Sequence, residues 1–168
     1  MYALISVSDK TGLDKLCEFL LSQQYSIIST GGTYQYIIDH FPDSLKNISK
    51  IENITNFPEI LNGRVKTLHP IIYGSLLHDR SNQEHLNQVK LHNIPNISLV
   101  VVNLYPFEKV CQNNSSYDKV IENIDIGGHT LIRASIKNNK QVNILTNPQQ
   151  YDQFILYSSS PDYNNSNN

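Results

Sequence analysis

The chain has 168 residues, a formal net charge of -2 and 39% hydrophobic residues. These values predict one globular domain whose core forms without disulfides or a metal. No apolar run approaches the about 18 residues of a membrane span, and the start of the chain lacks the charge of a secretion signal. No block of Lys and Arg offers the basic face that nucleic acids need. We therefore expect a cytoplasmic protein without membrane or nucleic-acid partners, with Cys17 and Cys111 reduced.

The first third of the chain alternates between strand and helix patterns. Tyr2–Val7 is a short apolar run, which is typical of a buried strand. Apolar residues then recur at helical spacing over 13–21, with charged residues on the other face. A second strand is predicted over Ser26–Ser29, a helix over 33–40 and a third strand over 45–48.

The rest of the chain continues this pattern after a long irregular segment, residues 51–70, of a length that is usually functional. The run 97–104 is apolar on both faces and predicts a central strand. The remaining predicted elements are helices over 82–92, 117–124 and 130–137 and a strand over 142–145. The alternation indicates an α/β fold, a mostly parallel sheet flanked by helices on both faces. Its ligand crevice should lie at the carboxyl ends of the strands.

Residues 158–168 are poor in apolar side chains, so we expect a folded domain over 1–157 and a disordered Asn/Ser-rich tail.

Two glycine pairs follow predicted strands or precede helices, where backbone N–H groups can bind an anion. Gly31-Gly32 follows the second strand and suits a phosphate, although the same residues are also ordinary turn and capping residues. Gly127-Gly128 follows Asp125, which is either a helix cap or a proton acceptor. Lys137 on the following helix is either a surface lysine or a partner of Asp125 in proton transfer.

Two cations in the long loop, Arg64 and Lys66, are separated by one residue and point the same way if the backbone is extended. A solvated basic turn is the alternative. His85 and His92 lie two helical turns apart, roughly 10 Å along the axis, which is too far to share one ion. We therefore expect no metal site.

Five motifs together resemble a known family, the IMP cyclohydrolase domain of the bifunctional purine biosynthesis protein. They are ISVSDKTGL at 5–13, ISTGGT at 28–33, GRVKTLHP at 63–70, VVNLYPF at 101–107 and ENIDIGG at 122–128. The resemblance runs from about residue 3 to residue 151, in order and with similar spacing.

The resemblance implies a methylglyoxal synthase-like fold, a Rossmann-like three-layer arrangement. It also implies the last step of purine biosynthesis, in which 5-formamidoimidazole-4-carboxamide ribotide closes its ring with loss of water to give inosine monophosphate (IMP). Neither metal nor cofactor is implied. A homodimer is expected, together with a separate transformylase that supplies the substrate, because this chain stops near the end of the first domain.

The resemblance also implies the site residues. Those near the ribotide phosphate would be Ser8, Lys10, Ser29, Thr30, Gly31, Gly32, Arg64 and Thr67. Those near the base would be Val102, Asn103, Asp125, Ile126 and Gly127. The catalytic group would be Lys66, Tyr105, Asp125 and Lys137.

This grouping suits the chemistry, because a carboxamide nitrogen must lose a proton while charge builds on the formyl oxygen. Asp125 would assist the deprotonation and Lys137 would relay a proton to the departing oxygen. Lys66 and Tyr105 would orient the substrate and stabilise the oxyanion. Holding the two reacting groups together would supply much of the acceleration.

The chain departs from the family in several places, and a second function stays open. Ile71, Tyr73 and Ser75 stand where the family tends to have smaller or different residues. Ser135-Ile136 replaces an alanine pair beside Lys137, and the bulk of Ile136 could shift the helix that aims the lysine. After Gln150 a family helix gives way to the predicted tail. The alternative function is a catalytically impaired nucleotide-binding or regulatory module of the same fold. A phosphate lyase acting on a triose phosphate is a third, more distant alternative.

Overall fold

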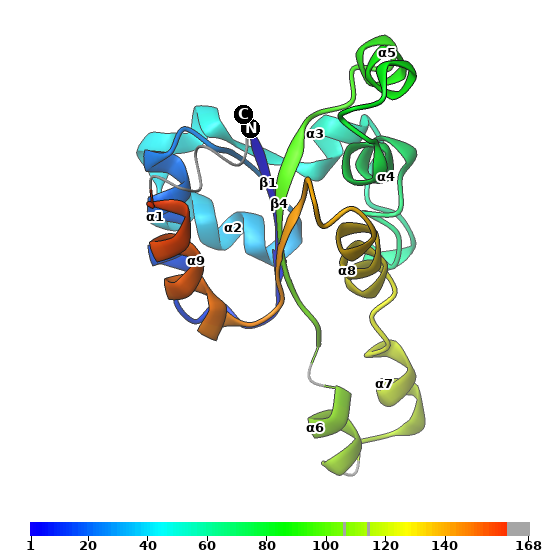
Figure 1. Ribbon diagram of the computed structural model, residues 1–168. Coiled ribbons are helices and arrows are strands. Elements are labelled where there is room, and N and C mark those ends of the chain that lie inside the picture. The colour runs from blue at the N-terminus through cyan, green and yellow to red at the C-terminus, as the bar shows by residue number, and fades with distance from the viewer. Residues whose placement is uncertain (106, 114, 161–168) are drawn as a thin grey trace.

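A five-stranded sheet with helices on both faces forms the body of the protein (Figure 1). The computed structural model describes residues 1–105, 107–113 and 115–160. The strand order is β3-β2-β1-β4-β5, and each pairing between neighbours is parallel. The strands are β1 (Tyr2–Val7), β2 (Ser26–Ser29), β3 (Ile48–Lys50), β4 (Ile97–Asn103) and β5 (Asn143–Leu145). The predicted α/β fold with a parallel sheet is therefore confirmed.

The helices occupy most of the remaining chain. They are α1 (Leu13–Ser22), α2 (Gly31–His40), α3 (Ile51–Thr55), α4 (Pro70–Leu77), α5 (Gln83–Leu91), α6 (Phe107–Gln112), α7 (Tyr117–Glu122), α8 (Gly127–Lys137) and α9 (Tyr151–Ser158). Short 3-10 helices lie at Pro42–Asn47, Leu61–Gly63 and Pro148–Gln150. No helix among the described residues is long and apolar enough to cross a membrane.

Two hydrophobic cores lie on opposite faces of the sheet because successive side chains of a strand point to opposite sides. Ala3 and Ile5 of β1 pack with α1, α2 and α9, and Leu4 packs on the other face with α3, α4 and α8. Six consecutive residues of β4 are buried, as expected for a strand covered on both faces between β1 and β5.

Several segments differ from the sequence-based expectation, among them α3 and α6, for which no helix was predicted. The predicted strand over 45–48 begins only at Ile48, because a 3-10 helix with Pro42 in its first turn precedes it. α4, for which no helix was predicted, begins with Pro70, whose fixed φ suits a first helical position. α9 occupies 151–158, where the family helix was expected to be missing.

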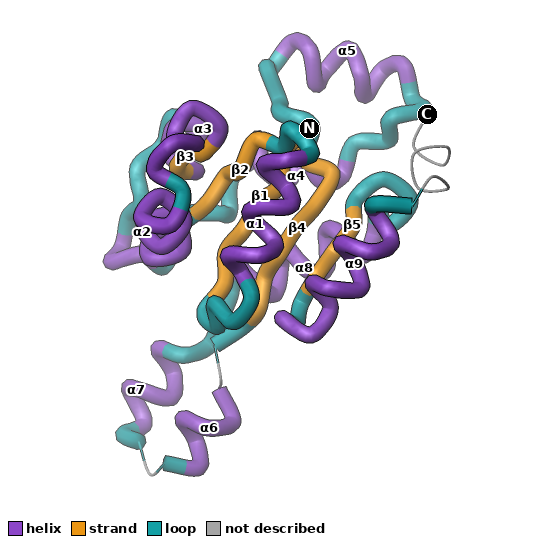
Figure 2. The backbone as a smooth tube through the Cα atoms, turned by 90° about the vertical axis from the view of Figure 1, so that its left-hand side faces the viewer, coloured by secondary structure: helices purple, strands orange, loops and turns teal. Residues whose placement is uncertain are grey.

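α9 is anchored by few side chains, which explains why the sequence signal was weak. The Phe154 ring packs edge-on against Phe19 of α1, with centroids 6.4 Å apart, and the two helices lie side by side (Figure 2). The helix includes Ser158, the first residue of the predicted tail. Residues 161–168 lie outside the described residues, so the tail stays a prediction.

α6 and α7 form an arm, residues 107–122, that projects from the carboxyl-end edge of the sheet (Figures 1 and 2). This arm leaves from Asn103 at the end of β4 and returns to the start of α8, so it flanks the predicted crevice.

Replacing Leu99 by Ala should lower the free energy of unfolding by about 2–5 kcal/mol, because Leu99 is fully buried in β4 and the cavity left behind adds to the lost burial. Urea unfolding followed by circular dichroism measures the change. The matched control is Leu91→Ala on exposed α5, which should stay within about 0.5 kcal/mol of the wild type. Equal effects of the two substitutions would contradict the assignment of β4 to the core.

Candidate functional site

The side chain of Asn103, at the end of β4, holds the loop that follows β1. Its Oδ1 accepts hydrogen bonds from the backbone N–H of Ser8 and of Asp9, at 2.7 and 2.9 Å, and from Ser8 Oγ at 2.9 Å. Its Nδ2 donates to the Asp9 carbonyl at 2.8 Å. Asn103 therefore holds Ser8, which lies 95 positions earlier in the chain, in place at the wall of the site.

Tyr151 interacts with the side chain of Asn103 and helps to hold it in place. The phenol is hydrogen-bonded to the Asn103 side chain, and its ring lies 3.7 Å from the position that a Gly12 Cβ would take. Burial, the negative charge of Asp9 and the nearby Cys17 raise the pKa of Tyr151 to about 12. Sequence reasoning missed this residue, although the apolar i, i+3 pair Tyr151 and Phe154 is a helical signal.

The first glycine pair opens α2 without a side-chain cap. Thr30 is the N-cap residue, but its hydroxyl bonds Ser6 Oγ at 2.8 Å instead of the helix. Ser29 Oγ donates to the Ile5 carbonyl at 2.7 Å and is fully buried, so this predicted phosphate ligand has no free side chain. Gly31 adopts a positive φ of 42°. The first turn of α2 thus offers its backbone N–H groups and the positive end of its dipole.

Lys66 and Thr67 connect the two glycine pairs. Lys66 Nζ lies 3.7 Å from the position that a Gly31 Cβ would take, and it pairs with Glu59 Oε2 at 3.1 Å. Thr67 is buried, and its Oγ1 lies only 2.6 Å from where a Gly127 Cβ would be. A side chain at residue 127 would clash there, so glycine allows the loop to touch the start of α8. The Lys66-Thr67 dipeptide therefore contacts the N-termini of both α2 and α8.

Asp125 lies at the second of these helix starts. Its Oδ1 accepts the Gly128 N–H at 2.7 Å, so the carboxylate is the helix cap that the residues alone suggested. Leu104 packs against the same turn, with its Cδ2 2.9 Å from a Gly128 Cβ position. Tyr105 follows on this loop with half of its surface exposed. Ile126 is also exposed, whereas Val102 is buried and has only its backbone to offer.

Arg64 and Lys10, the two other cations predicted near the phosphate, contact other groups. Arg64 pairs with Glu122 of α7, and its Nε donates to Glu122 Oε1 at 3.3 Å. This hydrogen bond and the attraction between the charges raise the pKa of Arg64 and lower the pKa of Glu122. Lys10 Nζ reaches only the carbonyl of Ser8, at 3.5 Å. Lys66 is thus the cation that the structure places at the start of α2.

The structure separates Lys137 from the rest of the predicted catalytic group. Asp125 caps the start of α8 and Lys137 is its last residue, so roughly 16 Å of helix lies between them. Asn138 then donates to the Leu76 and His78 carbonyls at the end of α4, at 2.9 and 3.0 Å. This end of α8 leads into the amino end of β5. The expectation that Asp125 and Lys137 face one crevice is therefore wrong within a single chain.

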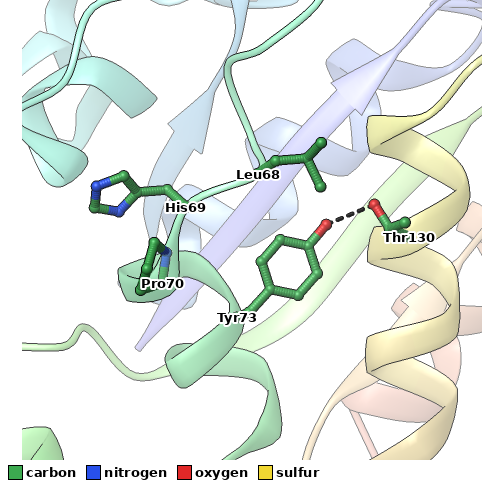
Figure 3. Close-up of a pocket in the computed structure, with 5 residues that line it drawn as sticks. All are labelled: Leu68, His69, Pro70, Tyr73 and Thr130. Carbon is green, nitrogen blue, oxygen red and sulfur yellow. Dashed lines mark hydrogen bonds between the residues drawn. The ribbon is translucent and has the colours of Figure 1, made fainter.

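An apolar hollow of about 400 Å³ adjoins the Thr67 segment. Figure 3 shows the Tyr73 hydroxyl directed to Thr130 Oγ1, at 2.6 Å, with Leu68 beside the ring. Since Thr130 Oγ1 donates to backbone carbonyls of its own helix, the Tyr73 hydroxyl is the donor between the two. Burial raises the pKa of Tyr73, so it stays neutral. His69 and Pro70 complete the lining.

His85 of α5 is engaged in a structural hydrogen bond. The ring of His85 accepts the Asp79 N–H at 3.0 Å. In the described part of the chain, no three His, Cys, Asp or Glu side chains are grouped so that they could hold a metal ion.

Comparison with known proteins relates this geometry to a family. A family model described as MGS-like domain matches residues 12–130. The bifunctional purine biosynthesis protein PurH of Leptospira biflexa serovar Patoc is 48% identical over 153 residues, which is 90% of this chain and 29% of the relative. PurH of Thermoanaerobacter sp. strain X514 is 49% identical over 154 residues, with 91% and 30% covered. The chain therefore spans about three-tenths of the length of these curated relatives.

A solved structure shows the same architecture. The crystal structure of ForH superimposes with a TM-score of 0.77 and 27% sequence identity, covering 100% of this chain and 82% of that one.

Tyr151→Phe should lower the free energy of unfolding at pH 8 by about 1 kcal/mol, because one buried hydrogen bond to Asn103 is lost. The folded-state pKa of Tyr151 is raised from 10.0 to about 12, so its contribution is complete below pH 10 and is lost as the pH rises to 12. The difference between wild type and variant should therefore shrink above pH 10 and reverse its sign by pH 12, because two pKa units correspond to about 2.7 kcal/mol. Urea unfolding at several pH values measures it, and a pH-independent difference would contradict this assignment.

Proposed function

Because this chain belongs to the MGS-like domain family, we propose that it is an IMP cyclohydrolase that closes the ring of the formylated ribotide with loss of water. One observation carries the proposal. The Lys66-Thr67 segment contacts both glycine helix starts, so an anion at one start and a heterocycle at the other would belong to the same small molecule. A ribotide has these two ends joined through a sugar.

The anionic end would bind at the start of α2. The uncapped N–H groups of Gly31 and Gly32 and the Lys66 ammonium favour a phosphate there. This geometry supports Lys66 in phosphate binding more than in the oxyanion role that the family resemblance implies. Arg64 would have to leave Glu122 to join it.

The heterocycle would lie at the start of α8. Asp125 Oδ1 serves the cap, so Oδ2 would accept the proton that the carboxamide loses and return it to the formyl-derived oxygen. That oxygen would leave as water when the formamide nitrogen gives up its proton. The helix N-terminus and the hydroxyl of Tyr105 would stabilise the oxyanion that develops on the formyl group. Binding both ends would also hold the formyl group and the carboxamide in contact, which favours an intramolecular closure.

Two further parts of the proposal concern partners. We propose a homodimer, as the family resemblance implies, and a transformylase that supplies the substrate, because the proposed reaction consumes a formylated ribotide. A binding or regulatory module is the second candidate, favoured by the position of Lys137 away from the site.

The direct test mixes the purified chain with the formylated ribotide and follows IMP formation by its absorbance. We expect turnover in the wild type. Tight IMP binding without turnover would favour the binding module instead, and neither binding nor turnover would contradict both functions.

Asp125→Asn should reduce kcat by about 10²- to 10⁴-fold, because the general base is lost. Stability should change little, since asparagine caps a helix as well as aspartate does. Steady-state kinetics and urea unfolding of the same preparation separate the two effects. Unchanged kcat would remove Asp125 from the chemistry.

Lys137→Ala should leave the affinity for IMP within about twofold of the wild type, because the lysine lies at the far end of α8. Calorimetric titration with IMP measures the affinity, and Lys66→Ala is the comparison that should lose it. A loss as large as that of Lys66→Ala would contradict the location of the site.

A further inference from the structure

We infer that Glu59 is a positioning residue of this site and that it holds the Lys66 ammonium beside the first turn of α2. The effect of this positioning on nucleotide binding rests on the proposed function, whereas the contact between Glu59 and Lys66 does not. Glu59 Oε2 lies 3.1 Å from Lys66 Nζ, and the two side chains are 35% and 28% exposed. The ion pair of Lys15 and Asp152 is 62% and 70% exposed, so solvent screens the Glu59 pair less.

The backbone between the two residues is a turn with unusual geometry. Ile60 and Val65 form an antiparallel bridge, and the three residues Leu61, Asn62 and Gly63 all have positive φ, at 54°, 54° and 90°. A bulky residue such as leucine rarely adopts this conformation. The side chain of Leu61 is 66% exposed, so packing does not explain why the turn tolerates it. What this turn achieves is to bring residues 59 and 66 face to face.

Gly63 makes the contact between the two charged groups possible. A Cβ on this residue would lie 2.7 Å from Glu59 Oε1 and 3.3 Å from Lys66 Nζ. The ion pair is therefore packed directly over the Gly63 backbone. Strained turns that persist at a site are a reason to look for function there, and this one fixes the position of one ammonium group.

Positioning matters because a lysine side chain is flexible and must lose rotamer freedom to bind an anion. Glu59 holds the Lys66 ammonium by an ion pair at 3.1 Å, and the ammonium still has N–H groups to offer a ligand at Gly31. Glu59 also adds negative charge near an anion site, which opposes binding. Salt screens this repulsion more strongly than it screens the part-buried Glu59–Lys66 pair at 3.1 Å, so experiments in high salt favour the positioning effect.

The test compares Glu59→Gln with the control Asp152→Asn, which breaks the exposed pair with Lys15. Each protein is treated with a limiting amount of an amine-acylating reagent, and modification of Lys66 and Lys15 is measured by mass spectrometry. We expect Glu59→Gln to raise the labelling rate of Lys66 about threefold or more and to leave Lys15 unchanged, because a released ammonium is more accessible. The control should not change Lys66.

The second readout is the affinity for IMP in about 0.5 M salt, where charge repulsion is screened. Glu59→Gln should weaken binding about fivefold, Glu59→Asp should restore part of it, and Asp152→Asn should have no effect. Unchanged Lys66 labelling in a Glu59→Gln protein with normal unfolding overturns the inference. Faster labelling with equal or tighter IMP binding also overturns it, because Glu59 would then be only a counter-ion.

These outcomes are distinguishable from failure of the proposed function. A wild-type chain that binds no IMP contradicts the proposed function. The labelling of Lys66 then decides by itself whether Glu59 holds the lysine in place.

Discussion

The close approach of the Lys66-Thr67 segment to two helix starts is the contact on which the site depends. Thr67 Oγ1 occupies the space that any side chain at residue 127 would need, and the Lys66 ammonium lies against Gly31. Packing therefore requires glycine at residue 127, and the positive φ of 42° favours glycine at residue 31. The result is a site with two N–H-rich ends and a lysine between loops that are distant in sequence.

The sheet provides the frame for this contact. β1, β2 and β4 are parallel neighbours, so their carboxyl ends deliver three loops to one edge. Asn103 then fixes the loop after β1 from the end of β4, and Tyr151 fixes Asn103. These polar bonds and the two buried cores hold the site on the packed elements of the sheet and its helices. The exposed α6–α7 arm projects beside the site.

Sequence reasoning recovered the order of the five strands because apolar periodicity is a local property, as the buried run of β4 shows. It found α1, α2, α5, α7 and α8 but missed α3, α4, α6 and α9. It also placed both glycine pairs at helix starts. Sequence reasoning could not show that the Ser29 hydroxyl donates to the Ile5 carbonyl or that Arg64 pairs with Glu122, because such bonds join distant segments. Lys137 was grouped with Asp125 both from the residues alone and by resemblance, although the length of α8 separates them. α9 escaped notice because only two apolar anchors mark it.

The most direct test of this account is an amide NMR titration of the chain with IMP. Residues of both glycine pairs, Gly31 and Gly127 among them, should shift together with one dissociation constant, since one ligand spans both helix starts. The amides of Asn138 and Val142, at the far end of α8, should not move. Shifts confined to one glycine pair, or strongest at Asn138, would contradict a single ribotide site at the Lys66-Thr67 segment.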